Sequence, residues 1–430
     1  MHPLTKLIRN DMKPSLGVTE PGAIAYAAAT ARRHTEGAIR QVVLRLNSGM
    51  YKNAFTCGIP GTERTGNLYA AALGAVGADP AKGLECLDGI TEDQAGEAQA
   101  LVGAGKVRAE MGEITSRILI EAKVTTDQGS AEVVIRDSHT NIVSIRENGV
   151  PVFEADGGAE LNAEPQTEEP AEIHGYTLEQ LVGYISAVPL EEIAFIRDAF
   201  PMNLALLREG LESGRTTFGP YLMRANGGEL ISADEQKTAS LLCNGAIEAR
   251  VLGLSRPAMS ITGSGAHGII AAMPLYAAYR VRGYPEEALL RATALSYLVC
   301  MYIKEYSGKL SAFCGCAIAA GTGMACGLAY LRGGTVQQMG GVIRNMSGSI
   351  TGMICDGGNQ GCAMKGVVAV DTAWRSVDLA MAGVSVDGIH GINASTPEET
   401  MRNMGRIASP GMVGTEETIM EILAGKGKPS

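Results

Sequence analysis

The hydrophobic pattern of this chain changes once, at an acidic stretch over residues 154–173. That stretch is rich in Glu, Ala, Gly and Pro and has almost no large apolar side chain, which is typical of an exposed linker. Residues 1–153 alternate short strand-like and helical patterns, whereas residues 174–430 have a helical pattern nearly throughout. We therefore expect an α+β protein, with an N-terminal α/β domain followed by a mostly α-helical domain.

Individual elements can be predicted within both parts. In the first part, alternating apolar residues and turn residues predict strands over Val42–Leu46, Ile118–Thr126, Glu132–Ile135 and Ile142–Arg146. Helical patterns in that part cover Asn67–Val76 and Pro80–Leu87. In the second part, Gly and Pro residues separate helical patterns over Leu178–Ala187, Leu190–Ser213, Ser232–Gly253, Ile269–Val281, Glu286–Tyr306, Gly315–Leu331, Thr335–Ser347 and Val367–Met381.

The composition argues against some partners and compartments. Only 19% of the 430 residues are charged and the formal net charge is −10, so the clustered Lys and Arg that bind nucleic acid are missing. Nine cysteines without a secretory context favour reduced thiols over a disulfide framework. Residues 1–17 have neither the apolar region nor the cleavage pattern of a signal peptide, so we expect a cytoplasmic protein.

One uncharged segment, Leu310–Leu331, is long enough to span a membrane. It consists mostly of Gly, Ala, Cys, Ser and Thr, whereas membrane spans are rich in large apolar residues. Small residues recur every four positions, at Gly315, Ala319, Gly323 and Gly327. This pattern favours a buried helix against which another backbone packs closely, and we expect no membrane span.

Five of the nine cysteines are concentrated in the second part, at Cys314, Cys316, Cys326, Cys355 and Cys362. Glycines between the last two allow the backbone to fold tightly around a bulky group. Thiolates select zinc or iron–sulfur clusters, but the paired Cys-x₂-Cys elements of a typical zinc site are missing here. The residues leave three interpretations open: an iron–sulfur cluster, a zinc site, or buried unreactive cysteines.

A glycine-rich loop, Gly263–Gly268, precedes a helical pattern. It matches the dinucleotide motif G-x-G-x-x-G, but the flanking strand and the acidic residue that this motif requires are missing. Free backbone amides at the start of the helix would instead suit a carboxylate. Within the loop, His267 is either a base or a packed histidine.

Two N-terminal segments contain further candidates for binding an anion. In Pro14–Pro21, Ser15 and Thr19 can hydrogen-bond a carboxylate, although both residue types are also common at helix N-termini. The second segment comprises Lys52, Asn53 and the following loop at 58–62. It either contacts an anion or is an ordinary loop.

Taken together, these segments resemble the iron–sulfur L-cysteine desulfidases and their relatives, which are distant kin of the bacterial iron–sulfur L-serine dehydratases. The resemblance covers nearly the whole chain. The stretches that carry it are Gly17–Pro21 (GVTEP), residues 52–53 (KN), Ile59–Thr62 (IPGT), Gly263–Gly265 (GSG), Leu310–Cys316 (LSAFCGC) and Asn345–Gly357, followed by Cys362 and Lys365.

This resemblance implies a cofactor and its ligands. In the family three cysteines hold a [4Fe–4S] cluster and the fourth iron is left for the substrate. Cys355 and Cys362 are then two of the ligands, and the third is Cys314 or Cys316, of which we choose Cys314. The N-terminal domain would bind substrate and the helical domain would bind the cluster. The substrate carboxylate is expected to bind at Ser15, Thr19, Asn53, Gly263, Ser264 and Gly265.

Two positions depart from the desulfidase pattern. The desulfidases have a cysteine, proposed as the catalytic base, where this chain has Val18, and they tend to have Asn-Gln where it has Ala266-His267. The scaffold and the cluster therefore resemble the family, whereas the acid–base groups differ. His267 becomes the candidate base that removes the α-proton, with Lys304 and Lys365 among its rivals.

We expect an iron–sulfur-dependent lyase that eliminates a hydroxyl or thiol group from a small amino acid and yields a 2-oxo acid and ammonia. The alternative is a non-catalytic iron–sulfur protein that senses oxygen or iron, because Val18 cannot take a proton. The expected partner is a small amino acid or a related carboxylic acid, without nucleic acid or membrane, and a homodimer is left open.

Overall fold

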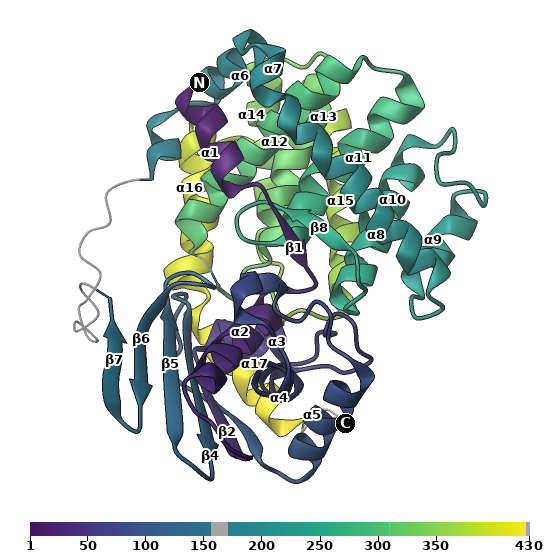
Figure 1. The fold of residues 1–430 in the computed structure, drawn as a ribbon. Helices are drawn as coiled ribbons and strands as arrows, with labels where there is room; N and C mark the ends of the chain where they lie inside the picture. The colour runs from purple at the N-terminus through teal and green to yellow at the C-terminus, as the bar shows by residue number, and fades with distance from the viewer. Residues whose placement is uncertain (156–170, 309, 427–430) are drawn as a thin grey trace.

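The computed structural model describes residues 1–155, 171–308 and 310–426. Most of the expected linker at 154–173 therefore lies outside the described residues. The described chain forms a sheet with covering helices and, beside it, a larger helical part (Figure 1). The predicted α+β fold is confirmed, with an N-terminal α/β region followed by a helical region.

A mixed sheet forms the first part, and its described strands follow the order β3-β2-β4-β5-β6-β7. Strands β2 and β3 are parallel, and the other neighbours are antiparallel. The strands are β2 Ile39–Leu46, β3 Val107–Met111, β4 Leu119–Thr126, β5 Ser130–Arg136, β6 Ile142–Glu147 and β7 Val150–Glu154. The four predicted strands are present as β2, β4, β5 and β6. The edge strands β3 and β7 were not predicted, because most of their side chains are exposed and the alternation of buried residues is lost.

Helices α2 (Thr19–Arg33) and α4 (Asn67–Val76) cover one face of this sheet. Both are rich in alanine and pack closely against each other: a Cβ atom at Gly74 would lie only 2.4 Å from the carbonyl oxygen of Ala25. The connecting helices are α3 Ser48–Ala54 and α5 Glu92–Gly103. The helix predicted over residues 80–87 is instead a 3₁₀ segment that Gly83 interrupts at a φ of 57°.

The second part is built around α12 (Glu286–Ser307), which contacts α11, α13 and α16. Its other helices are α6 Leu178–Ala187, α7 Leu190–Ile193, α8 Ala199–Glu212, α9 Phe218–Ala225, α10 Glu235–Val251, α11 Gly265–Arg282, α13 Gly321–Leu331, α14 Val336–Ile350, α15 Gly361–Met381 and α16 Pro397–Arg406. The single helix predicted over residues 190–213 is divided into α7, a 3₁₀ turn and α8. Pro201 explains the division, because it has no amide hydrogen with which to continue a helix from the preceding turn.

Gly323 and Gly327 of the small-residue stripe lie on the buried helix α13 and pack against a neighbouring backbone, as the pattern predicts, whereas Gly315 and Ala319 lie at the π-helical turn that precedes α13. A Cβ atom at Gly323 of α13 would lie 2.2 Å from the carbonyl oxygen of Ser296 in α12, and one at Gly327 would lie 2.8 Å from that of Ala292. None of the helices in the described part of the chain is both long and apolar enough to cross a membrane.

The two ends of the chain cross between the two parts (Figure 1). Helix α1 (Pro3–Asp11) lies on the helical part, where Thr5 Oγ1 is 2.7 Å from the hydroxyl of Tyr184. Strand β1 (Lys13–Leu16) then pairs with β8 (Pro257–Ser260) and leads into α2. At the other end, α17 (Val413–Gly425) lies against α3 of the sheet part. Residues from distant segments therefore meet between the two parts.

Candidate active site

A cavity of about 240 Å³ lies between the sheet part and the helical part. The sheet part contributes Glu20 and Asn53 to its wall, and the helical part contributes the start of α11 and the end of α12. Four of the five clustered cysteines, Cys314, Cys316, Cys355 and Cys362, line this one space. The fifth, Cys326, is buried within α13 and does not line the cavity.

Two backbone hydrogen bonds join the cysteine segments. The amide of Cys314 donates to the carbonyl of Met353 at 3.0 Å, and the amide of Cys355 donates to that of Ala312 at 2.6 Å. Cys362 lies at the start of α15, where its thiol donates to the carbonyl of Gly357 at 3.5 Å. These contacts fix all three segments relative to one another around the cavity.

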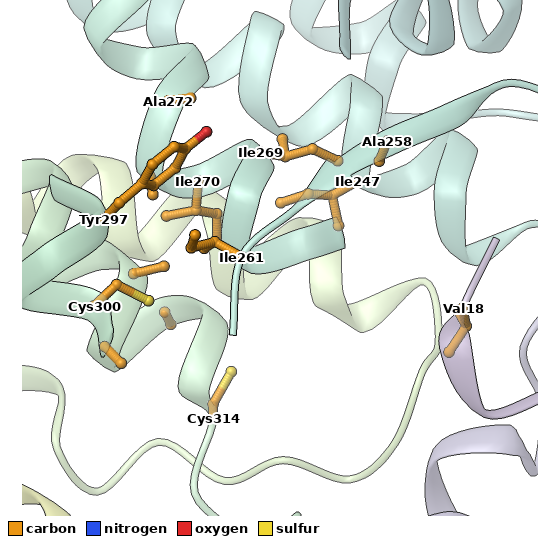
Figure 2. Packing of buried hydrophobic residues seen from close by; sticks show 14 of the residues in the cluster. Val18, Ile247, Ala258, Ile261, Ile269, Ile270, Ala272, Tyr297, Cys300 and Cys314 are labelled. Atoms are coloured by element: carbon orange, nitrogen blue, oxygen red, sulfur yellow. The ribbon is translucent and has the colours of Figure 1, made fainter. Parts of the chain in front are cut away.

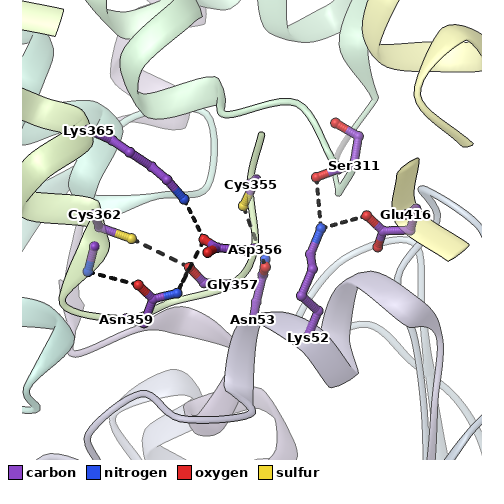
Figure 3. A network of polar contacts seen from close by, with 11 residues as sticks. Lys52, Asn53, Ser311, Cys355, Asp356, Gly357, Asn359, Cys362, Lys365 and Glu416 are labelled. Carbon is purple, nitrogen blue, oxygen red and sulfur yellow. Dashed lines mark hydrogen bonds and ion pairs between the residues drawn. The ribbon is translucent and has the colours of Figure 1, made fainter. Parts of the chain in front are cut away.

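The loop between Cys355 and Cys362 also lies tightly on α3 (Figure 3). Gly357 has a φ of 109°, and a Cβ atom there would lie 2.4 Å from the carbonyl oxygen of Lys52. The amide of Gly358 donates to the carbonyl of Asn53 at 3.1 Å. Glycine is required at 357 for both the backbone conformation and the close approach, as the glycine-rich sequence indicates.

The cysteine thiols differ in acidity. The thiol of Cys316 donates to the sulfur of Cys314, which lowers the pKa of Cys314 and raises that of Cys316; the amide of Ala317 also stabilises the Cys314 thiolate. Burial raises the pKa of Cys355, and it raises the pKa of Cys362 to about 12. Within this group Cys314 is therefore the thiol that most readily becomes a thiolate.

Lysines near the thiols supply compensating positive charge. Lys365 lines the cavity, forms an ion pair with Asp356, and favours the thiolate forms of Cys314 and Cys355 (Figure 3). Lys52 is fully buried and also favours the thiolate of Cys355. Its ammonium group bonds Glu416 of α17 at 2.6 Å and the carbonyl of Ser311 at 3.1 Å.

The donor set fits an iron–sulfur cluster. Soft thiols from separate segments face one space, and the buried Lys52 and the partly buried Lys365 can offset the negative charge of their thiolates. Among the described residues, no three His, Cys, Asp or Glu side chains converge closely enough to hold a single metal ion. The thiols are thus spread around a space rather than directed at one point.

His267 forms part of the same wall, in the first turn of α11, and is buried. Its Nδ1 lies 2.5 Å from Thr262 Oγ1, and the Thr262 hydroxyl donates to the carbonyl of Ile261 at 2.8 Å. The hydroxyl oxygen is therefore the acceptor, so Nδ1 carries the hydrogen and Nε2 keeps its lone pair. Nε2 faces the cysteine turn, because a Cβ atom at Gly315 would lie 2.7 Å from it. Burial, with the charge of Lys304, holds the pKa of His267 well below its usual value, so the ring is neutral.

The predicted carboxylate-binding residues are only partly brought together. Gly263, Ser264 and Asn53 line the cavity. The hydroxyl of Thr19 donates to the carbonyl of Gly263 at 3.3 Å. Ser15 lies in β1, outside the cavity wall, and its hydroxyl is buried without a hydrogen-bond partner among the described residues. Gly265 also lies behind the wall, at the first turn of α11.

Sequence reasoning missed Glu20, although it belongs to the recognised GVTEP motif. Its carboxylate lines the cavity and accepts a hydrogen bond from the amide of Asn53 at 2.8 Å. Glu416 was missed for a different reason, because it follows the predicted elements by many residues and no local pattern links it to Lys52. Both carboxylates bind residues of α3, Glu20 binding Asn53 and Glu416 binding Lys52.

Val18 lies at the start of α2, across from the buried residues of the helical part (Figure 2). It is buried, and its Cγ1 would lie 3.2 Å from a Cβ atom at Gly358. The side chain is therefore an apolar contact for the cysteine loop. It has no group that can accept a proton.

The fold thus places a cavity lined with thiols between an α/β part and a helical part. The model of the serine dehydratase alpha chain family matches residues 81–421. The chain therefore belongs to the serine dehydratase alpha chain family.

Full-length relatives carry the name UPF0597 protein. One from Clostridium botulinum (strain Langeland) is 38% identical over 430 residues, which is 99% of each chain. Another from Caldanaerobacter subterraneus subsp. tengcongensis is 35% identical over 424 residues, or 98% of each chain. A third, from Methanocella arvoryzae, is 34% identical over 422 residues, again 98% of each chain.

Proposed function

We propose that the protein is an iron–sulfur-dependent lyase that carries out β-elimination on a small α-amino acid. The observation that carries this proposal is the single cavity at which the cysteine segments, a neutral histidine and polar groups of the α/β part meet. Membership of the serine dehydratase alpha chain family supports the same class of reaction.

Cys314, Cys355 and Cys362 would hold a [4Fe–4S] cluster, and the stabilised thiolate of Cys314 supports it as third ligand over Cys316. When bound, such a cluster supplies an iron that acts as a Lewis acid on the β-leaving group. Lys52 and Lys365 compensate the charge of the thiolates from opposite sides of the loop.

His267 is the proposed base. Its Nε2 keeps a lone pair and lies beside Gly315 in the cavity wall, and the contact with Thr262 sets the tautomer. Nε2 takes the α-proton of the amino acid, and the electron pair of the C–H bond forms the new double bond as the β-group departs with its bonding electrons. The proton on Nε2 then passes to the departing hydroxide or hydrosulfide, which leaves as water or hydrogen sulfide and restores the neutral base. The resulting 2-aminoacrylate tautomerises to an imine, and water hydrolyses it to a 2-oxo acid and ammonia.

Groups around the base would hold the substrate. Thr19 positions the Gly263–Gly265 loop by donating to Gly263, and Gly263 and Ser264 of this loop line the cavity. The hydrogen bond from Asn53 to Glu20 keeps an acidic and a polar group on the opposite wall. Ser15 remains a candidate only if its segment moves, because its hydroxyl lies outside the wall.

The test is an anaerobic screen of small amino and hydroxy acids, including L-serine and L-cysteine, for release of a 2-oxo acid and ammonia. We expect turnover with at least one α-amino acid that carries a β-leaving group. The control is Cys355→Ser, which should lose both the cluster absorbance and the activity. Intact cluster absorbance without turnover of any compound would contradict the lyase and favour the sensor alternative.

A further inference from the structure

A buried arginine lies beside the cavity without a partner for its charge. Arg250, near the end of α10, is only 5% exposed. Among the described residues none forms a hydrogen bond or an ion pair with its guanidinium group, and its Nε is shielded from solvent. By contrast, the buried Lys52 is paired with Glu416, and the partly buried Arg332 is paired with Glu235. Burying a charge without a partner is costly, so an unpaired buried arginine indicates an anion that binds there.

The neighbours of Arg250 place it directly behind the wall that contains the proposed base. A Cβ atom at Gly265 would lie 2.5 Å from Arg250 Nε, so glycine is needed for the guanidinium to approach α11. Burial lowers the pKa of His267, and the charge of Arg250 acts in the same direction. Burial raises the pKa of Cys57, and here the same charge opposes the rise. The guanidinium therefore lies within electrostatic range of both the α11 start and the loop at Cys57.

The start of α11 offers hydrogen-bond donors at the same place. This helix has 18 residues, and its N-cap residue Ser264 makes no side-chain hydrogen bond to it. The first backbone hydrogen bond of the helix runs from the amide of Gly268 to the carbonyl of Ser264. The amides of residues 265–267 therefore have no hydrogen-bond partner inside the helix. Amides at a helix start together with a guanidinium form a site for a carboxylate.

We propose that Arg250 is the counter-ion of the substrate α-carboxylate, which it binds together with the first amides of α11. This inference rests on the proposed function and supplies the cation that the carboxylate-binding groups so far described lack. Thr19 and Asn53 cannot replace it, since both are uncharged and donate to Gly263 and Glu20. The ligand class is an α-amino acid with a free carboxylate, whose ammonium group faces the carboxylate of Glu20.

The experiment compares L-alanine, which has no leaving group and cannot be eliminated, with L-alaninamide, which lacks the carboxylate. Their affinities are measured from thermal unfolding of the anaerobically purified holoprotein at increasing ligand concentration. The variants are Arg250→Met and Arg250→Lys. Arg332→Met is the matched control, because it removes an arginine that is paired with Glu235 and Asp378.

For Arg250→Met we expect the affinity for L-alanine to fall about thirtyfold or more, with no change for L-alaninamide. Without ligand, its unfolding temperature should stay equal to that of the parent or rise, because an uncompensated buried charge has been removed. The affinity of Arg250→Lys for L-alanine should lie between that of the parent and that of Arg250→Met. Arg332→Met should show the opposite pattern, with a lower unfolding temperature and unchanged affinity for L-alanine.

A purely structural arginine would give different results. Lower ligand-free stability of Arg250→Met, up to failure to fold, would overturn the inference, as would an equal loss of affinity for both ligands. Failure of L-alanine to stabilise the parent would also overturn it. If the parent binds L-alanine through Arg250 but eliminates no amino acid, only the proposed function fails. If elimination occurs and Arg250→Met leaves KM unchanged, only this inference fails.

Discussion

At the scale of single residues, the geometry of His267 gives the first prediction. Removing the imidazole by His267→Ala should lower turnover about a hundredfold or more while leaving iron content unchanged, because a positioned base contributes about 10²–10⁴-fold. Steady-state rates on the substrate found by the screen, with iron and sulfide assays, measure this. The control His390→Ala changes an exposed histidine and should leave turnover unaltered. Turnover within a few-fold of the parent would exclude His267 as the base and return the question to Lys304 and Lys365.

The choice between Cys314 and Cys316 gives a second prediction. Cys314→Ser should abolish the visible absorbance of the anaerobic protein, because it removes the thiolate that Cys316 and the amide of Ala317 stabilise. Cys316→Ser should keep most of the absorbance, since a serine hydroxyl can still donate to Cys314. Absorbance spectra with iron analysis decide between them, and the reverse result would assign the third ligand to Cys316.

The residues of the candidate site could be predicted unequally well from the sequence. Cys355, Cys362 and His267 could be proposed from the sequence because glycines and clustered cysteines surround them, and all three line the cavity. Arg250 was missed because it lies inside an ordinary helical pattern, and an unpaired charge becomes visible only when its neighbours in space are known. The tautomer of His267 could not be predicted from the sequence either, since it depends on the direction in which the Thr262 hydroxyl donates its hydrogen bond.

At the scale of elements, the ion pair between α3 and α17 gives a third prediction. Glu416→Ala leaves the buried ammonium of Lys52 with only the carbonyl of Ser311, which should cost about 3–5 kcal/mol of unfolding free energy. Anaerobic urea unfolding measures this change. The double variant Lys52→Met/Glu416→Leu should recover most of the loss, because no charge is left unpaired.

The control for this pair is Glu417→Ala, on the exposed side of the same helix, which should change stability by less than about 0.5 kcal/mol. If Glu416→Ala and Glu417→Ala changed the unfolding free energy equally, the buried ion pair would not hold α17 in place. A double variant as unstable as Glu416→Ala would show that Lys52 has a further role.

Most helices and the central strands could be predicted from periodicity because they have one buried face. Helix α6 buries Leu178, Leu181, Tyr184 and Ile185 on one face, and β4 and β5 alternate buried and less buried residues. The edge strand β7 is exposed along its whole length, and α17 lies beyond the last predicted helix. Pairing of β1 with β8 joins segments more than 240 residues apart, and no local pattern could reveal it.

At the scale of the whole molecule, a cluster held by three cysteines leaves one iron without a protein thiolate, and that iron should be labile in air. We therefore expect aeration to bleach the protein and abolish elimination activity, and ferrous iron with a thiol reductant to restore part of both. Paired absorbance and activity time courses, with an anaerobic sample as control, measure this. Full activity after prolonged aeration with an unchanged spectrum would contradict the proposed mechanism.

The contact between α3 and α17 also constrains how the protein is made. Lys52 and Glu416 are separated by 364 positions in the chain. At a translation rate of 5–20 residues per second, the ribosome needs roughly 20–70 s to synthesise the segment between them. During that interval the lysine beneath the cysteine loop has been synthesised but its carboxylate has not. A nascent chain that has passed Cys362, or one ended by a stop codon between Cys362 and α17, thus contains every cysteine of the site and still lacks the carboxylate that pairs with Lys52.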